Sequence, residues 1–323
     1  MVYDDVAPEE MLTKLRRIPG GVWRTYLAPD VKVAFISINK NACTSLKWMM
    51  ADLAGENLET FRVLWQPHVD DSEAVHDRTL WRESPWLDTL SLHERSQIHP
   101  DHGWFIFAVV RDPRLRLFSA WQNKLLIEGP HSQRWRDEPW YPRHPLTQQS
   151  VVEDFAAFVE ALEQPGMQLR REDPHFRDQV ELLAEHAVPY TRIYEIGELG
   201  ALISDLREHL EREGRNGELL LPRANPTPLH ATGELFAGGV LEQVERIYAA
   251  DFERFGHLWD FRKASDAPSW TERDLAACEV ESRLGRRIAQ LHSLARTERD
   301  RRAAAEKQLA DLHAKAREQT TAL

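Results

Sequence analysis

The chain has 323 residues, of which 42% are hydrophobic and 9% aromatic, so it can bury a full core and is not a mostly disordered protein. Its 41 Lys and Arg residues are outnumbered by 52 Asp and Glu residues, and the net charge of −11 disfavours non-specific nucleic-acid binding. Only two cysteines occur, Cys43 and Cys278, so the sequence predicts neither a disulfide framework nor a cysteine-rich zinc site.

The N-terminal segment from Met1 to Glu10 is acidic and has no apolar stretch of the signal-peptide type. The best apolar runs cover residues 31–38 and 104–110, which is far below the about 20 residues that a membrane-spanning helix needs. We therefore expect a soluble, cytoplasmic protein in which both runs form buried strands.

Helix patterns follow each of these two runs. Residues 44–53 are compatible with a helix directly after the first strand. After the second strand, Asp112 is a suitable N-cap for a helix that has Pro113 in its first turn. Continuous apolar strands alternating with helices favour an α/β fold, in which a central parallel sheet is covered on both faces.

The remainder of the body continues this alternation. Helices are expected over residues 151–162, 200–211 and 240–255, and a short strand over residues 190–194. The segment 129–147 is instead punctuated by Gly and Pro, and its length is typical of a functional lid. Its residues Trp135, Trp140 and Tyr141 either stack on a flat acceptor or pack as part of the loop.

The C-terminal part of the chain differs in charge from the rest. Residues 281–318 contain ten Lys/Arg and six Asp/Glu, a net of +4, which leaves −15 for the other residues. A break at residues 264–269 predicts a linker between a body of residues 1–263 and a helical tail of residues 270–323.

The tail also has an apolar pattern. A 4-3-4-3 spacing from Leu284 to Leu312 predicts a heptad seam, interrupted by Glu298 and Arg302. Two interpretations remain open, a solvated helix that lies on its own domain and a coiled coil that makes a homo-oligomer through residues 281–318.

A short polar loop joins the first strand to its helix. Lys40 adds a positive charge there, Thr44 and Ser45 add hydroxyl donors, and the start of a helix offers unpaired N–H groups to an anion. Because open α/β sheets bind ligands outside the carboxyl ends of strands, this position favours phosphate or sulfate. The residues concerned are Lys40, Asn41, Ala42, Cys43, Thr44 and Ser45.

This loop is not a Walker A motif, because no glycine occurs between Val31 and Asp52, and ATP with magnesium is therefore disfavoured. The alternative is an ordinary strand–helix turn capped by Thr44 or Ser45. We interpret Cys43 as a small loop residue.

The second polar segment follows the second strand. Arg111 stands where that strand ends, and a guanidinium can hold a phosphate through two hydrogen bonds. Ser119 lies about two turns into the next helix, on the same side as Arg116, and can donate to the same group. The alternative is a structural Arg–Asp cap with Ser119 packed inside the helix.

Both segments resemble the two nucleotide-binding signatures of sulfotransferases that use 3′-phosphoadenosine 5′-phosphosulfate (PAPS). The most similar branch is the carbohydrate type, sulfotransferase family 2, with the HNK-1, chondroitin and dermatan sulfotransferases. Its first signature, Pro-Lys-x-x-x-Thr, is matched by Lys40 and Thr44, with Asn39 in place of the proline. Its second signature, Arg-x-Pro-x-x-Arg-x-x-Ser, is matched by Arg111, Pro113, Arg116 and Ser119. The resemblance covers roughly residues 31–258. Further similarity lies in the segments 121–124, 154–158, 173–179, 223–227 and 248–252.

The resemblance implies a P-loop-like three-layer fold and an enzyme that moves a sulfuryl group from PAPS to a hydroxyl of a carbohydrate or related small molecule. It implies that Lys40 stabilises the leaving phosphate, that Thr44 and Ser45 hold the 5′ end, and that Arg111 and Ser119 hold the 3′-phosphate without a metal. We expect no membrane anchor of the kind that the Golgi members have, and the sequence contains only two cysteines, fewer than those members. Because it is acidic, a less anionic acceptor suits it better.

The acceptor hydroxyl needs a general base. We expect His93, because related enzymes place a base upstream of the second signature, and His175 is the next choice. Other candidates are Glu94, His99, His102 and His68. Two other functions stay open, a P-loop-type kinase of nucleosides or small molecules and a non-catalytic scaffold with a coiled-coil tail.

Overall fold

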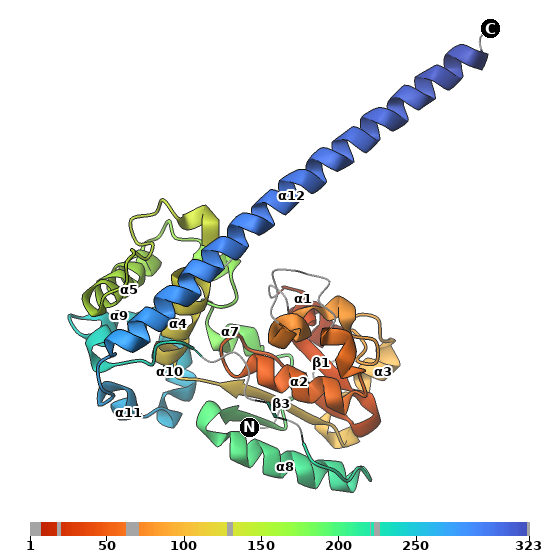
Figure 1. Cartoon of the computed structure of the whole chain (residues 1–323). Helices are drawn as coiled ribbons and strands as arrows, with labels where there is room; N and C mark the ends of the chain where they lie inside the picture. Colours follow the sequence, from red (N-terminus) through yellow and green to blue (C-terminus); the bar gives the residue numbers. More distant parts are fainter. Residues whose placement is uncertain are drawn as a thin grey trace.

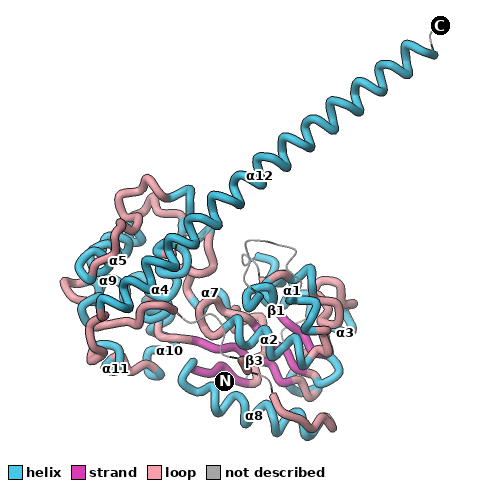
Figure 2. The backbone as a smooth tube through the Cα atoms, viewed as in Figure 1, coloured by secondary structure: helices cyan, strands magenta, loops and turns pink. Residues whose placement is uncertain are grey.

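A computed structural model of the chain describes residues 8–17, 21–62, 71–127, 132–219, 221–222 and 227–321 (Figure 1). One sheet with the strand order β1-β2-β3-β4 lies between helices. The strands are β1 (Thr25–Ala28), β2 (Val33–Ile36), β3 (Phe105–Val110) and β4 (Arg192–Glu195). The strands β2, β3 and β4 are parallel, whereas β1 pairs antiparallel with β2. Figure 2 shows the strands in magenta, with helices in cyan around them. The predicted α/β fold is therefore confirmed, with one antiparallel edge strand.

The register of β2 and β3 decides where the following loops lie. Val33 pairs with Phe105 and Ile36 with Ala108, so the two strands end at the same edge of the sheet. Every residue of both strands is buried, because helices cover both faces of the sheet. The two polar segments predicted from the sequence both leave the sheet at this edge.

The described helices include every range that was expected from the sequence, with a difference at one place. They are α1 (Pro8–Arg17), α2 (Cys43–Leu53), α3 (Leu92–Ser96), α4 (Pro113–Trp121), α5 (Gln148–Glu163), α6 (Leu169–Glu172), α7 (Gln179–Leu183), α8 (Leu199–Arg212), α9 (Val240–Ile247), α10 (Ala249–Phe255), α11 (Arg262–Ser265) and α12 (Glu272–Thr321). The helix expected over residues 240–255 is divided into α9 and α10 at Tyr248, where φ is −110° and ψ is 32°. The Tyr248 hydroxyl donates to Phe176 O (2.8 Å), and the break turns α10 toward α7.

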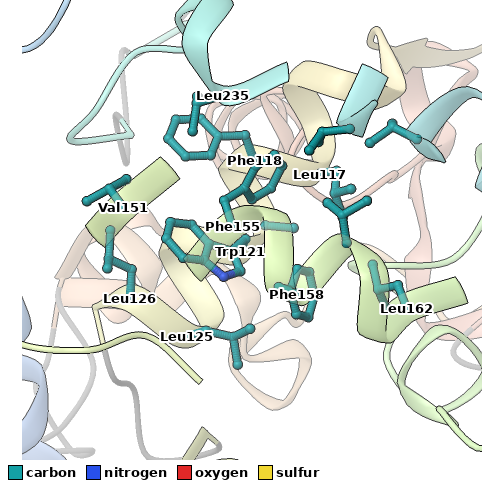
Figure 3. Close-up of a cluster of buried hydrophobic side chains, with 14 of the residues drawn as sticks. Leu117, Phe118, Trp121, Leu125, Leu126, Val151, Phe155, Phe158, Leu162 and Leu235 are labelled. Carbon is teal, nitrogen blue, oxygen red and sulfur yellow. The ribbon is translucent and has the colours of Figure 1, made fainter. Parts of the chain in front are cut away.

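An aromatic cluster holds α4 in place (Figure 3). Phe118 and Trp121 on α4 meet Phe155 on α5 at ring distances of 5.2 and 5.5 Å, both edge to face. Trp140 and Tyr141, which were considered as acceptor platforms, are buried at 8% and 7% exposure in the same cluster. Their burial explains the aromatic composition of the loop as packing. Residues 128–131 of that loop lie outside the described residues.

The long helix α12 starts on the body and then leaves it (Figure 1). Trp270 and Cys278 belong to the aromatic cluster, and Glu279 Oε2 accepts from Leu146 N (3.0 Å). Beyond Ala289, the side chains that the structure describes are exposed. The division into residues 1–263 and 270–323 stays a prediction. The first residue of the predicted tail is hydrogen-bonded to the body, because Trp270 Nε1 donates to His230 O (2.8 Å). In the described part of the chain, we find no helix that is both long enough and apolar enough to cross a membrane.

Candidate functional site

The loops after β2 and β3 touch each other. Arg111, the first residue after β3, donates from Nη1 to the backbone oxygen of Lys40 over 3.1 Å. Parallel neighbouring strands bring their carboxyl ends to one edge of the sheet, and the structure places both motifs there. Burial is the largest influence on Arg111 and lowers its pKa to about 10, which leaves the guanidinium charged at neutral pH.

The backbone of the 39–42 loop has an unusual shape. Lys40 and Ala42 both adopt left-handed conformations, with φ of 68° and 56°, although neither is glycine. Such turns gather backbone N–H groups into a concave surface that binds anions, and strained residues of this kind concentrate at functional sites. Ala42 is the N-cap of α2 and provides no side-chain cap, so the alternative of a turn with Thr44 or Ser45 as the cap is not what the structure shows. The first turn of α2 is thus suited to an anion.

A buried glutamine, Gln179, holds the two loops together. Its Oε1 accepts from Asn41 Nδ2 (2.7 Å) and from Arg111 N (3.0 Å), and its Nε2 donates to Arg111 O (2.8 Å). Asp251 in turn accepts from the backbone of Gln179 (3.0 Å), and both residues are fully buried. Neither residue was predicted from the sequence as part of the site. They fall in two segments of family similarity, and a polar residue with that degree of burial needs partners.

The second signature is used more for structure than expected. Arg116 is 1% exposed, and its guanidinium donates to the backbone oxygens of Asn39 (3.0 Å), Arg177 (2.7 Å) and Pro174 (2.9 Å). It therefore fixes the 39–42 loop against the segment before α7.

Ser119 lies on the same helix and is 2% exposed. Its Oγ lies 2.8 Å from Thr227 Oγ1, and the preceding residues 223–226 lie outside the described ones. An Arg–Asp cap does form at the start of α4, but Arg114 makes it and not Arg111. The Arg114 amide donates to Asp112 Oδ1 (2.9 Å). Arg111 itself points to the other loop instead.

His175 lies beside the 39–42 loop in a chain of hydrogen bonds. Its Nδ1 is 2.6 Å from Asp173 Oδ1, and its Nε2 is 3.0 Å from Asn39 Nδ2. A carboxylate accepts and an amide nitrogen donates, so Nδ1 carries the proton and Nε2 presents a lone pair. Burial, followed by the charge of Lys124, lowers the pKa of His175 to about 3, although its bond with Asp173 acts in the opposite direction. The ring is neutral at physiological pH.

A second histidine, His76, reaches the start of α2 from the short helix Asp71–His76. Its Nδ1 is 2.8 Å from Lys47 Nζ, and its Nε2 is 3.0 Å from Thr44 Oγ1. Desolvation by the surrounding protein and then the positive charge of Lys47 hold the pKa of His76 well below its ordinary value, although part of the residue is exposed. No sequence motif pointed to His76, because this contact depends on the fold.

The other candidate bases lie elsewhere. Four of them precede the amino end of β3, namely His93, Glu94, His99 and His102. The Phe105 amide at the start of β3 donates to Lys32 O (2.8 Å), so the amino ends of β2 and β3 lie side by side. The 39–42 loop follows β2 at the opposite edge of the sheet, about 17 Å away along β3. His93 is exposed on α3, which packs against α1, and Glu94 caps its own helix. His68 lies outside the described residues. The structure therefore brings His175, and not His93, to the loop.

A family model described as "Sulfotransferase family" matches residues 23–257, which is most of the chain. The match includes all four strands and both polar loops. No curated protein and no solved structure matches the chain. Among the described residues, no group of three or more His, Cys, Asp and Glu side chains is arranged to hold a metal ion.

Proposed function

Since the chain belongs to the sulfotransferase family, whose members transfer sulfuryl groups, we propose that its donor is PAPS and its acceptor a hydroxyl of a carbohydrate or related small molecule. One observation carries the proposal, the 3.1 Å contact between Arg111 Nη1 and Lys40 O. It brings two cationic motifs to one place beside the uncapped start of α2. PAPS has two anionic ends, a 5′-phosphosulfate and a 3′-phosphate, and this pair of motifs fits that distribution of charge.

The positive charge around the 39–42 loop supports this fit. The positive charges of Lys47, Lys124 and Lys40 all lower the pKa of His76, whose ring reaches Thr44 at the start of α2. When bound, PAPS supplies the activated sulfuryl group. In our proposal Lys40 stabilises the negative charge that grows on the leaving phosphate oxygen, and Arg111 holds the 3′-phosphate, with Ser119 nearby. The geometry of the transfer resembles that of phosphoryl transfer, in which positioning and charge stabilisation dominate.

The hydrogen bonds of His76 set the role of Thr44. A lysine ammonium only donates, so Nδ1 of His76 accepts from Lys47 and Nε2–H donates to Thr44 Oγ1. The proton of the Thr44 hydroxyl can then point to a phosphate oxygen at the start of α2. His76 is in this account a positioning residue that makes Thr44 a donor, and Ser45 lies beside it at the same helix start.

We propose His175 as the general base in place of His93. Asp173 holds the Nδ1–H side of the ring, which leaves the Nε2 lone pair beside Asn39. An acceptor hydroxyl that takes the place of the Asn39 amide would pass its proton to Nε2 as its oxygen attacks the sulfur. A neutral imidazole whose Nδ1–H bonds to a carboxylate can accept a proton at Nε2.

Calorimetric titration tests the proposal. We expect adenosine 3′,5′-bisphosphate to bind without magnesium and more tightly than ATP with magnesium. Preference for ATP with magnesium would favour the kinase alternative, and absence of binding to any adenine nucleotide would favour the scaffold. Mass spectrometry of cell extracts incubated with the protein and PAPS then identifies the acceptor by the mass of an added sulfuryl group. The matched control is the Lys40→Ala variant, which should give far less of this product in the same time.

A further inference from the structure

The exposed apolar side chains of the protein are concentrated on α12. Nine large hydrophobic residues of the described part are exposed, and six of them lie on this helix. The six are Val280, Leu284, Ile288, Leu291, Leu294 and Leu309. The helix extends away from the body, so no other part of the described chain covers its outer half (Figure 1). Clustered apolar exposure of this kind is typical of an interaction surface.

Even at its base, the helix has a second apolar face that the body does not use. Ser282 and Ala289 face the body and are 0% and 2% exposed, whereas Leu284 and Leu291 are 58% and 51% exposed. At about 100° per residue, Leu284 lies about 200° and Leu291 about 180° around the helix from Ser282. The heptad seam therefore points directly away from the body, and a second helix can lie on it without meeting the body.

We propose that this seam pairs with the seam of a second copy of the chain, antiparallel and centred near Asp300. In this register Leu291 lies opposite the partner's Leu309, and Ala295 lies opposite the partner's Ala305. The polar interruption also finds a match, because Glu298 lies opposite the partner's Arg302 and the reverse pair forms by symmetry. This inference does not depend on the proposed function.

The charges in the seam select the antiparallel orientation. In a parallel pair, Glu298 would meet the partner's Glu298 and Arg302 the partner's Arg302, so two layers of the seam would hold like charges. The antiparallel pair replaces them by two opposite-charge contacts. In the single chain, Glu298 pairs with Arg301 (2.6 Å) and Arg302 with Glu306 (2.8 Å), and these side chains are all more than 60% exposed. Exposed ion pairs contribute little to stability, so they can give way to partners in the seam.

The distribution of charge over the chain favours a second copy as the occupant. Residues 281–318 carry +4 and the remainder −15, and the antiparallel register carries the end of each basic tail back toward the acidic body of the partner. Arg299 and Arg301 flank the seam, and each approaches the same residue of the second copy. Exposed like charges are screened at physiological ionic strength, so the tests are done under that condition.

The mass of the full-length chain in solution is the first test. Light scattering should give twice the chain mass of 37.5 kDa at tens of micromolar protein. Leu291→Glu with Leu309→Glu should give a monomer, and the control Ser293→Glu, an exposed position of the same helix off the seam, should stay dimeric. A monomeric wild type, or a dimer that tolerates both seam substitutions, would overturn the proposal.

Two further experiments test the orientation. Glu298→Arg should dissociate the dimer, because it places an arginine opposite the partner's Arg302, and adding Arg302→Glu should restore it. A parallel pair would hold like charges in both layers before and after these changes, so it predicts no such loss and recovery. Ala295→Cys protein mixed with Ala305→Cys protein should form a mixed disulfide under mild oxidation, since the native Cys43 and Cys278 are buried. Disulfides within each variant alone, with none between the two, would rule out the antiparallel arrangement.

Discussion

Replacing Gln179 with leucine removes the side chain that joins the two loops of the site and keeps a similar volume. The substitution deletes four hydrogen bonds of the side chain, one to Asn41 (2.7 Å), two to the backbone of Arg111 (3.0 and 2.8 Å) and one to Asp251 (3.2 Å). At about 1 kcal/mol per bond, the free energy of unfolding should fall by about 4 kcal/mol. Since domains are stable by about 5–15 kcal/mol, the variant should still fold.

The control is Gln122→Leu. Gln122 is equally buried and makes two hydrogen bonds to the backbone of Leu229, both 2.9 Å long, so its loss should cost about 2 kcal/mol. Urea denaturation measures both stabilities, and calorimetry measures binding of adenosine 3′,5′-bisphosphate. Gln179→Leu should weaken that binding at least tenfold, and Gln122→Leu by less than threefold. Equal losses of affinity in the two variants would refute the claim that Gln179 builds the site rather than the fold.

Substitutions of Lys40, Thr44 and His175 each have an expected outcome. Lys40→Ala should lower turnover by about 100- to 1,000-fold with an unchanged circular dichroism spectrum, as measured with any acceptor found in the extract assay. Thr44→Val should weaken binding of adenosine 3′,5′-bisphosphate about tenfold, and adding His76→Ala should weaken it no further, because His76 acts through Thr44. The pKa of His175 is about 3 in the folded chain and near 6.5 in the unfolded chain, so the unfolded state binds the proton first and stability falls as pH drops from 6.5 toward 3. His175→Asn should reduce that slope by up to about 1.4 kcal/mol per pH unit in urea titrations, and an unchanged slope would contradict the assignment.

The location of the site followed from the sequence, whereas its supporting residues did not. Arg111 comes directly after one buried apolar run and Lys40 comes two residues after the other, and the parallel arrangement of such strands brings their ends together. Gln179, Asp251 and His76 act through contacts between segments far apart in the chain, and no local pattern encodes such contacts.

Local patterns also failed where tertiary contacts decide the backbone. The strand β1 is only four residues long and was not predicted, since its pairing with β2 defines it. The helix break at Tyr248 was missed for a similar reason, because it accompanies a buried hydroxyl that bonds to Phe176. His93 was expected from its order in the chain relative to the second signature, but order does not tell at which edge of the sheet a residue lies. The heptad spacing, in contrast, predicted the long helix α12 directly.

The central claim is that Arg111 holds the 3′-phosphate of a nucleotide whose 5′ end lies at Lys40. The most direct test compares dissociation constants for adenosine 3′,5′-bisphosphate and adenosine 5′-monophosphate, in the wild type and in Arg111→Ala. Because the comparison is a ratio, any general loosening of the 39–42 loop cancels. We predict that the wild type prefers the bisphosphate strongly and that Arg111→Ala binds the two nucleotides almost equally. A preference that survives the substitution undiminished would contradict the account.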